Sequence, residues 1–340
     1  MNTLKYIIGI VAALAMTSCG NHLPKDGKPA ANGMEFLAVA GIDGDSLNID
    51  GDFTFGNDAE DLAHMMLTLD TIKALGLDKV MAIDTVVGSV RIMGRHQFEG
   101  TSLALLLGET TLGDTRTCWL ATYGRDGMID FMRIGNCHGI NLNYWDEADE
   151  HTCHVGIDST AITFGKDNDK SIQLQRRVSM KVRQDGAEPS DSALWFIQNN
   201  VPVTIGNDGR FTLGKTTNDY SGSSDLLTAY WLKKRGMEVL AWIPLSDNTF
   251  CDQVSAFLDA SKDSLTDPAQ LWGDFSQLIW SRLAGDTDGV MTWCCAHPDT
   301  QLAHATVKAL KDCTPEYLDT LLQRVTDAKA RDYCRQQLGK

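Results

Sequence analysis

The sequence predicts an α+β protein in which a mainly antiparallel β domain precedes a helix-rich domain. The first part of the chain carries Gly-Asp and Asp-Gly pairs between β-branched and aromatic runs, a pattern typical of β-hairpins because these residues tolerate positive φ. The later part carries apolar residues at helical spacing after Asp-Pro and Thr-Pro pairs, which are helix-start signals. Of the 340 residues, 43% are apolar and 22% are charged, close to globular averages. We therefore expect a folded body with a real core.

The first residues are typical of an export signal. Lys5 precedes an apolar run from Tyr6 to Met16, which is too short to span a bilayer as a helix. The stretch Met16-Thr17-Ser18-Cys19 resembles the lipobox of bacterial lipoproteins, with Met at a position where Leu is usual. This resemblance implies cleavage before Cys19 and lipid attachment to Cys19. The alternative is an ordinary secretory signal in which Cys19 happens to lie near the cleavage point.

The chain divides into four predicted segments. Residues 1–18 are the signal peptide, and residues 19–34 are a polar tether that cannot bury enough apolar surface to order itself. Residues 35–218 are predicted as the β-rich domain and residues 219–340 as the helix-rich domain. The predicted boundary lies within the stretch Lys215–Ser224, whose small polar residues are typical of a linker or long loop.

The clearest predicted hairpin lies at residues 117–134, around the three-residue loop Arg125-Asp126-Gly127. Strand alternation gives it two faces, one of which we expect to be core. The first face has Trp119, Ala121, Tyr123, Ile129 and Phe131, and the second has Leu120, Thr122, Asp130 and Met132.

Other elements follow from the period of the apolar residues. Residues 58–75 are predicted as a helix with Asn57 or Asp58 as the N-cap. The predicted strands are residues 89–93, 102–107, 153–157, 161–164, 172–182, 203–213 and, in the later part, 238–243. The predicted helices of the later part are residues 225–235, 250–260, a helix opening at Pro268 and a helix opening at Pro315.

Nine cysteines are many for this length. Without Cys19 eight remain, and an even number in an exported protein suggests disulfides. We predict that Cys137 and Cys153 are bonded to each other or lie within bonding distance, closing a loop of about 17 residues. If Cys313 and Cys334 flank one continuous helix, its rise holds them roughly 30 Å apart and excludes their pairing.

The same neighbourhood contains a candidate metal site. His138, His151 and Cys153 are residue types that zinc binds, although their spacing matches no recognised zinc motif. Three readings stay open: a disulfide with solvated histidines, a metal site, or neither. A further hypothesis is carbohydrate binding through an exposed Trp119/Tyr123 or Trp145 platform.

Composition excludes several function classes. The formal charge of −15, from 30 basic and 45 acidic residues, has the wrong sign for a nucleic-acid partner. No Gly-x-Ser-x-Gly, Walker or dinucleotide pattern occurs, so the sequence favours a non-enzyme and we expect no cofactor.

The order of signal, tether, Gly-turned β region and helical tail is similar to that of uncharacterised envelope lipoproteins of Gram-negative gut anaerobes. This similarity implies an envelope address and no catalytic residues. Gly20 after Cys19 favours the outer membrane, facing the periplasm or the surface. The expected function is therefore a lipid-anchored protein that binds or scaffolds. Its expected partners are the membrane, through the lipid, and an unknown envelope protein or glycan. The alternative is a metal-assisted periplasmic hydrolase using His138, His151 and Cys153.

Overall fold

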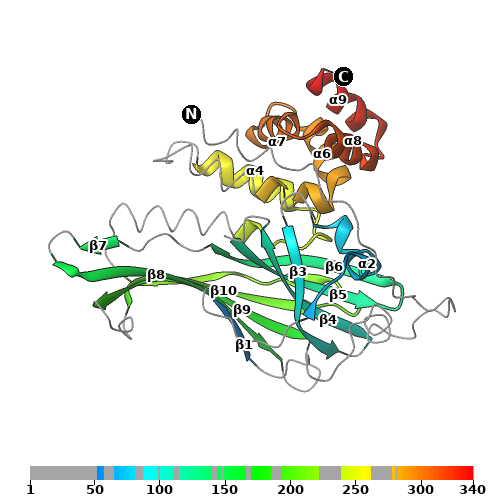
Figure 1. Cartoon of the computed structure of the whole chain (residues 1–340). Coiled ribbons are helices and arrows are strands. Elements are labelled where there is room, and N and C mark those ends of the chain that lie inside the picture. The colour runs from blue at the N-terminus through cyan, green and yellow to red at the C-terminus, as the bar shows by residue number, and fades with distance from the viewer. Residues whose placement is uncertain are drawn as a thin grey trace.

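Two antiparallel sheets precede a group of helices along the chain (Figure 1). The computed structural model describes residues 52–56, 65–81, 87–98, 100–110, 115–138, 144–146, 149–165, 170–184, 193–221, 239–261, 278–280 and 282–339. All described strands lie at or before residue 221, and the helices from α4 onward run from residue 250 to residue 338. The predicted α+β class, with its β part first and its helical part second, is confirmed.

The first sheet has five strands in the order β2-β3-β4-β5-β6, and every neighbouring pair is antiparallel. Its strands are β2 (Met65–Met66), β3 (Val87–Phe98), β4 (Thr101–Thr110), β5 (Thr115–Gly124) and β6 (Gly127–His138). β5 and β6 form the predicted hairpin. Because Gly124 pairs with Gly127, the loop has two residues instead of the predicted three, and Gly127 takes a φ of 121°.

The second sheet has seven strands, again antiparallel, with the main order β1-β8-β9-β10-β11. β7 also pairs with β8, and β12 also pairs with β10. Its strands are β1 (Asp52–Gly56), β7 (Tyr144–Asp146), β8 (Asp149–Phe164), β9 (Ser171–Gln184), β10 (Ala193–Ile205), β11 (Phe211–Leu213) and β12 (Thr217–Ser221). The two predicted strands at 153–157 and 161–164 are thus one strand, β8.

β12 corrects the expectation of a loop at residues 215–224, because residues 217–221 pair with residues 196–200 of β10. β11 and β12 share the same edge of β10 and are separated opposite Pro202. Gly214 donates its N–H to the Pro202 carbonyl at 2.7 Å. Since proline has no N–H to return, the ladder is interrupted there.

The sheets pack face to face around a core of alternating apolar residues. This core includes Leu105 and Leu120 of the first sheet and Leu174 and Val203 of the second. The predicted alternation of the hairpin is confirmed for Leu120 and Met132, which lie in this core, and for the opposite face. The expectation that one hairpin face is core was too narrow, because both faces are buried. The second core contains Trp119, Ala121, Tyr123 and Phe131.

That second core is covered by a short helical segment. α2 (Leu69–Ala74) is capped by Thr68, whose side chain accepts a hydrogen bond from the Thr71 N–H, and the 3-10 helix η3 (Leu77–Lys79) follows. The predicted helix over 58–75 was therefore wrong at Met65 and Met66, which pair with β3. Residues 57–64 lie outside the described part.

The helical part comprises α4 (Phe250–Ser261), α6 (Thr287–Ala296), α7 (Gln301–Lys311), α8 (Pro315–Arg324) and α9 (Ala328–Leu338). α4 and α8 confirm two predicted helices, and Thr314 caps α8. Residues 325–327 separate α8 from α9, so the premise of one continuous helix between Cys313 and Cys334 was wrong. Among the described residues, no helix has the length and apolar character needed to cross a membrane.

Residues 239–249, named here the connector, join the two parts. The predicted strand at 238–243 was wrong, because residues 239–240 are helical and the residues after them form turns. Trp242, Ile243 and Pro244 are buried, and residues 239–241 are half-buried. Trp242 lies in the core between the sheets, Ile243 in the core of the helices, and Leu245 packs against the core under α2.

Candidate functional site

The structure locates the backbone of four predicted site residues. Cys137 and His138 lie at the end of β6, in the five-stranded sheet, whereas His151 and Cys153 lie on β8, in the seven-stranded sheet. Their side chains are outside the described part of the structure, and Cys19 lies outside it altogether. The disulfide, metal and lipidation predictions for these residues therefore stay predictions.

Five of the remaining cysteines form no disulfide. Cys251, Cys294, Cys295, Cys313 and Cys334 are free thiols. Burial raises the pKa of Cys294 to about 12 and that of Cys334 to about 11. These two thiols are protonated at neutral pH and are poor nucleophiles.

A second group of sequence hypotheses concerned metals and aromatic platforms. Within the described ranges, no cluster of three or more His, Cys, Asp or Glu residues is arranged to hold a metal ion. Trp119 is 6% exposed and Tyr123 is fully buried, so the hypothesis of an exposed Trp119/Tyr123 platform was wrong. Both rings pack in the core under α2. The side chain of Trp145 is outside the described part.

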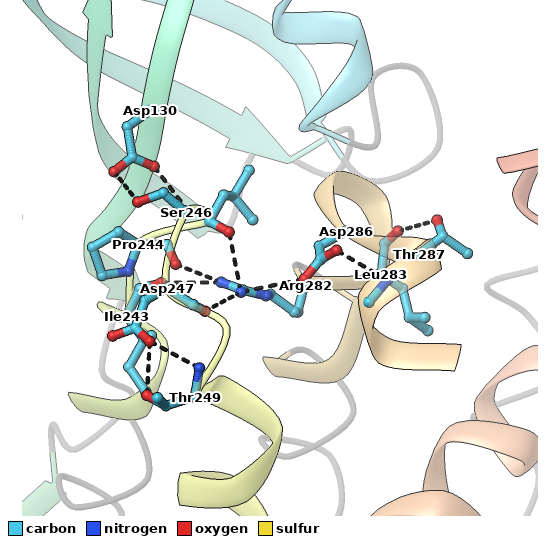
Figure 2. A network of polar contacts seen from close by, with 12 residues as sticks. Asp130, Ile243, Pro244, Ser246, Asp247, Thr249, Arg282, Leu283, Asp286 and Thr287 are labelled. Atoms are coloured by element: carbon cyan, nitrogen blue, oxygen red, sulfur yellow. Dashed lines mark hydrogen bonds and ion pairs between the residues drawn. The ribbon is translucent and has the colours of Figure 1, made fainter. Parts of the chain in front are cut away.

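Figure 2 shows a buried polar network where the connector meets both parts of the molecule. At its centre on the sheet side is Asp130 of β6, whose carboxylate is 4% exposed. Its Oδ1 accepts the N–H groups of Phe131 at 2.8 Å and Ser246 at 3.1 Å. Its Oδ2 accepts the Phe211 N–H at 2.9 Å and the Ser246 hydroxyl at 2.6 Å. One carboxylate thus joins β6, β11 and the connector.

Arg282 is the centre of the network on the helical side and is 3% exposed. Its Nη1 donates to the carbonyls of Ile243 at 3.5 Å and Pro244 at 2.7 Å, and its Nη2 donates to those of Leu245 at 3.2 Å and Asp247 at 2.6 Å. The carboxylate of Asp286 lies 3.3 Å from Nη2. The guanidinium carbon also lies 4.7 Å from the centroid of the Phe250 ring.

The contacts of this network hold the connector in place, and they are not suited to catalysis. A serine nucleophile needs a base that can take its proton, but the Ser246 hydroxyl donates to a carboxylate that also accepts three backbone N–H groups. Burial lowers the pKa of Arg282, an effect that the nearby Asp286 opposes. Arginine stays charged in proteins, so Arg282 holds the connector carbonyls as a cation.

A different arrangement of polar groups lies on the outer face of the seven-stranded sheet. We name it the carboxamide face and define it by exposed or half-buried side chains of β9, β10 and β12: Gln173, Gln175, Arg177, Phe196, Gln198, Asn200 and Asp219. The residues that alternate with them, such as Leu174 and Val201, point into the core between the sheets. In strand register Gln175 lies opposite Asn200, and Gln198 lies opposite both Arg177 and Asp219.

The side chains of the carboxamide face form one hydrogen-bonded network. Asn200 Oδ1 accepts from Gln175 Nε2 at 3.1 Å and from Gln198 Nε2 at 3.2 Å. Asn200 Nδ2 donates to Asp219 Oδ2 at 3.0 Å. Beside them the Arg177 guanidinium carbon lies 4.1 Å from the centroid of the Phe196 ring. Three strands therefore present polar groups whose positions are fixed before any partner arrives.

The carboxamide face is the functional candidate that sequence reasoning missed. Two signals were present: the alternation of Gln173 and Gln175 with apolar residues, and two further carboxamides at positions 198 and 200. Bringing them together requires the register of β9, β10 and β12, which depends on pairings between distant residues.

Comparison with known proteins adds no relative. No protein-family model matches the chain, and neither a curated protein nor a solved structure is significantly similar to it.

Proposed function

We propose that this chain is a lipid-anchored cell-envelope protein that binds a partner through its carboxamide face. The lipobox-like stretch at residues 16–19 supports the anchor. The polar tether that follows it gives the folded body reach from the membrane surface. The anchor sets the location, and the folded part supplies the binding surface.

The observation that carries the binding role is the hydrogen-bonded network centred on Asn200. An ordinary solvated sheet face holds long, independent charged side chains, whereas here two glutamines and an aspartate converge on one asparagine. Groups held in this way lose little side-chain freedom when a partner binds, which lowers the entropic cost of association. This arrangement favours recognition over mere solvation.

The anchor is tested by Cys19→Ala in cells. We expect the unaltered chain to partition with membranes and to carry lipid, and the variant to accumulate unprocessed or to become soluble. A processed Cys19→Ala chain that still partitions fully with membranes would contradict the lipid anchor.

The binding role is tested by a photo-crosslinking residue placed in the native envelope. Thr204 is the position of choice, because it is exposed on the same face of β10 as Asn200. Gln323 on α8 is exposed and serves as the matched control. We expect adducts from position 204 and none from position 323. Equal labelling from both positions, or none from position 204, would argue against a binding face here.

A further inference from the structure

We propose that the partner of the carboxamide face is a neutral polysaccharide. This inference rests on the proposed function, since it names the class of partner for the same surface. Four properties of the face carry it: its charge, its remaining hydrogen-bonding capacity, its broad and shallow geometry, and its lack of an apolar anchor.

The face is electrically balanced in a strongly acidic protein. It holds one cation, Arg177, and one carboxylate, Asp219, whereas the whole chain carries a formal charge of −15. Anionic polymers are repelled by such a chain, and a cationic partner would find stronger attraction elsewhere on it. A neutral partner is the class for which this local balance is complementary.

The remaining hydrogen-bonding groups match those of sugar hydroxyls. Gln175 and Gln198 each give one N–H to Asn200 and have no other side-chain hydrogen bond to the described residues. Each side chain therefore keeps its second N–H and its carbonyl oxygen for a ligand. Gln173 is similar, since its Nε2 donates to the Leu174 carbonyl at 3.3 Å. Each glutamine thus offers a donor beside an acceptor, and a hydroxyl group is both at once.

The geometry suits a polymer lying along the strands. From residue 173 to residue 177 the face extends about 14 Å along β9, and from β9 to β12 it extends about 10 Å across. It is a sheet surface and therefore broad and shallow. A chain of repeating sugar units can place hydroxyls along it without entering a cavity.

A protein partner is less well matched. Protein interfaces usually depend on a few desolvated anchors, above all aromatic side chains. The one aromatic residue of the face, Phe196, is covered by the Arg177 guanidinium at 4.1 Å. The exposed Tyr220 lies opposite Ile197 and so belongs to the other face of the sheet.

The test is affinity electrophoresis of the detergent-solubilised full chain in gels that contain one polysaccharide each. Dextran, soluble starch and mannan are the neutral probes, and pectin and alginate are the acidic ones. We expect at least one neutral polymer, and neither acidic polymer, to retard the chain. The double variant Gln175→Ala/Asn200→Ala should weaken that binding about tenfold or more, because it removes two carboxamides of the network. Gln323→Ala, which deletes an exposed carboxamide on α8, should bind as the unaltered chain does.

The outcomes separate the two proposals. Thermal unfolding of each variant verifies that the chain is folded. No retardation by any neutral probe, retardation by acidic probes alone, or full retention by the double variant would overturn the polysaccharide inference. If crosslinking at position 204 still succeeds in that case, the binding role stands and its partner belongs to another class. If crosslinking also fails, the proposed function itself is wrong.

Discussion

Arg282 illustrates how a buried charge can determine the path of a loop. Its two terminal nitrogens contact four residues of the connector, and all four acceptors are backbone carbonyls. A carbonyl that faces the interior needs a donor, because leaving it unpaired costs about 1–3 kcal/mol. No other side chain offers five donors in a planar fork. The connector therefore depends on arginine at position 282.

We predict that Arg282→Met destabilises the protein by about 3–5 kcal/mol, because it leaves these carbonyls and the Asp286 carboxylate without their buried partner. Urea unfolding measures this change. Arg210→Met is the control, since Arg210 is exposed and lies 3.8 Å from its partner Asp208, and its loss should change stability by less than about 1 kcal/mol. Equal effects of both substitutions would refute the role given to Arg282.

Asp288, near the start of α6, provides a pH-dependent contact. It accepts the Thr326 N–H at 2.6 Å and the Thr326 hydroxyl at 2.8 Å. Burial alone would raise the pKa of Asp288, but these hydrogen bonds and one from the Asp327 N–H outweigh it and lower the pKa. A lowered folded-state pKa means that the carboxylate adds stability above its unfolded pKa of about 3.9 and that this stability is lost as the pH falls through the folded value.

We predict that Asp288→Asn lowers the free energy of unfolding by about 1 kcal/mol at neutral pH, where the charge is present. The difference from the unaltered chain should shrink as the pH falls through the lowered pKa of Asp288, because protonation then removes the charge that the variant already lacks. Chemical unfolding at a series of pH values measures it, with the exposed Asp299→Asn as control. A difference that does not depend on pH would contradict the assigned cause.

At the scale of elements, a glycine of β4 leaves room for a tryptophan ring of β5. A Cβ atom at Gly108 would lie 2.5 Å from Cη2 and Cζ3 of Trp119, and 3.1 Å from the Val87 side chain. The indole ring of Trp119 therefore occupies the space above residue 108. Any side chain there would displace a ring that is buried in the core under α2.

We predict that Gly108→Ala destabilises the protein by about 1–3 kcal/mol through overpacking. The diagnostic measurement is a double-mutant cycle with Trp119→Leu, which removes the clashing ring atoms. In the Trp119→Leu background, Gly108→Ala should cost much less than in the unaltered chain. If the two costs are equal, the loss comes from the backbone of β4 and not from the ring.

The sequence predicted best those elements in which apolar residues recur with a clear period or form a continuous run. β3, β4, β5, β6 and β9 alternate or carry continuous apolar runs, and the cap at Thr314 begins α8. The predicted strand at 203–213 was wrong at residues 206–210, which separate β10 from β11. β12 was missed because an exposed edge strand has no buried face, and its pairing with β10 is a property of distant residues. Met65 and Met66 fit a helical period locally, but β3 offers them a sheet edge.

The carboxamide face and the buried polar network could likewise be predicted only in part from the sequence. The residue types of the carboxamide face were visible in the sequence, whereas the contact between Gln175, Asn200 and Asp219 was not. Asp130 and Arg282 were not predicted as core residues because charged residues are rarely fully buried. Only the path of the connector explains their burial.

At the scale of the whole molecule, the sheets and helices share contacts beyond the connector. The Arg324 side chain of α8 donates to the carbonyl of Lys79, which ends η3, at 3.3 Å, and to that of Ala284 at 2.6 Å. The division of the chain into the domains 35–218 and 219–340 stays a prediction. The contacts nevertheless link the stability of one part to that of the other.

The connector supplies the strongest of these links, because three successive cores each hold one of its side chains. Trp242 is 1% exposed between the two sheets, while Ile243 packs with the helices. If either part unfolded alone, the connector side chain that it buries would become exposed. We predict that β4–β5 peptides and α6–α7 peptides lose protection at the same urea concentration when hydrogen exchange is followed by mass spectrometry. Trp242→Ala should cost about 3–5 kcal/mol and separate the two transitions, because the connector then loses its hold on the sandwich core. Separate transitions in the unaltered chain would mean that the two parts are independent and that the connector only joins them.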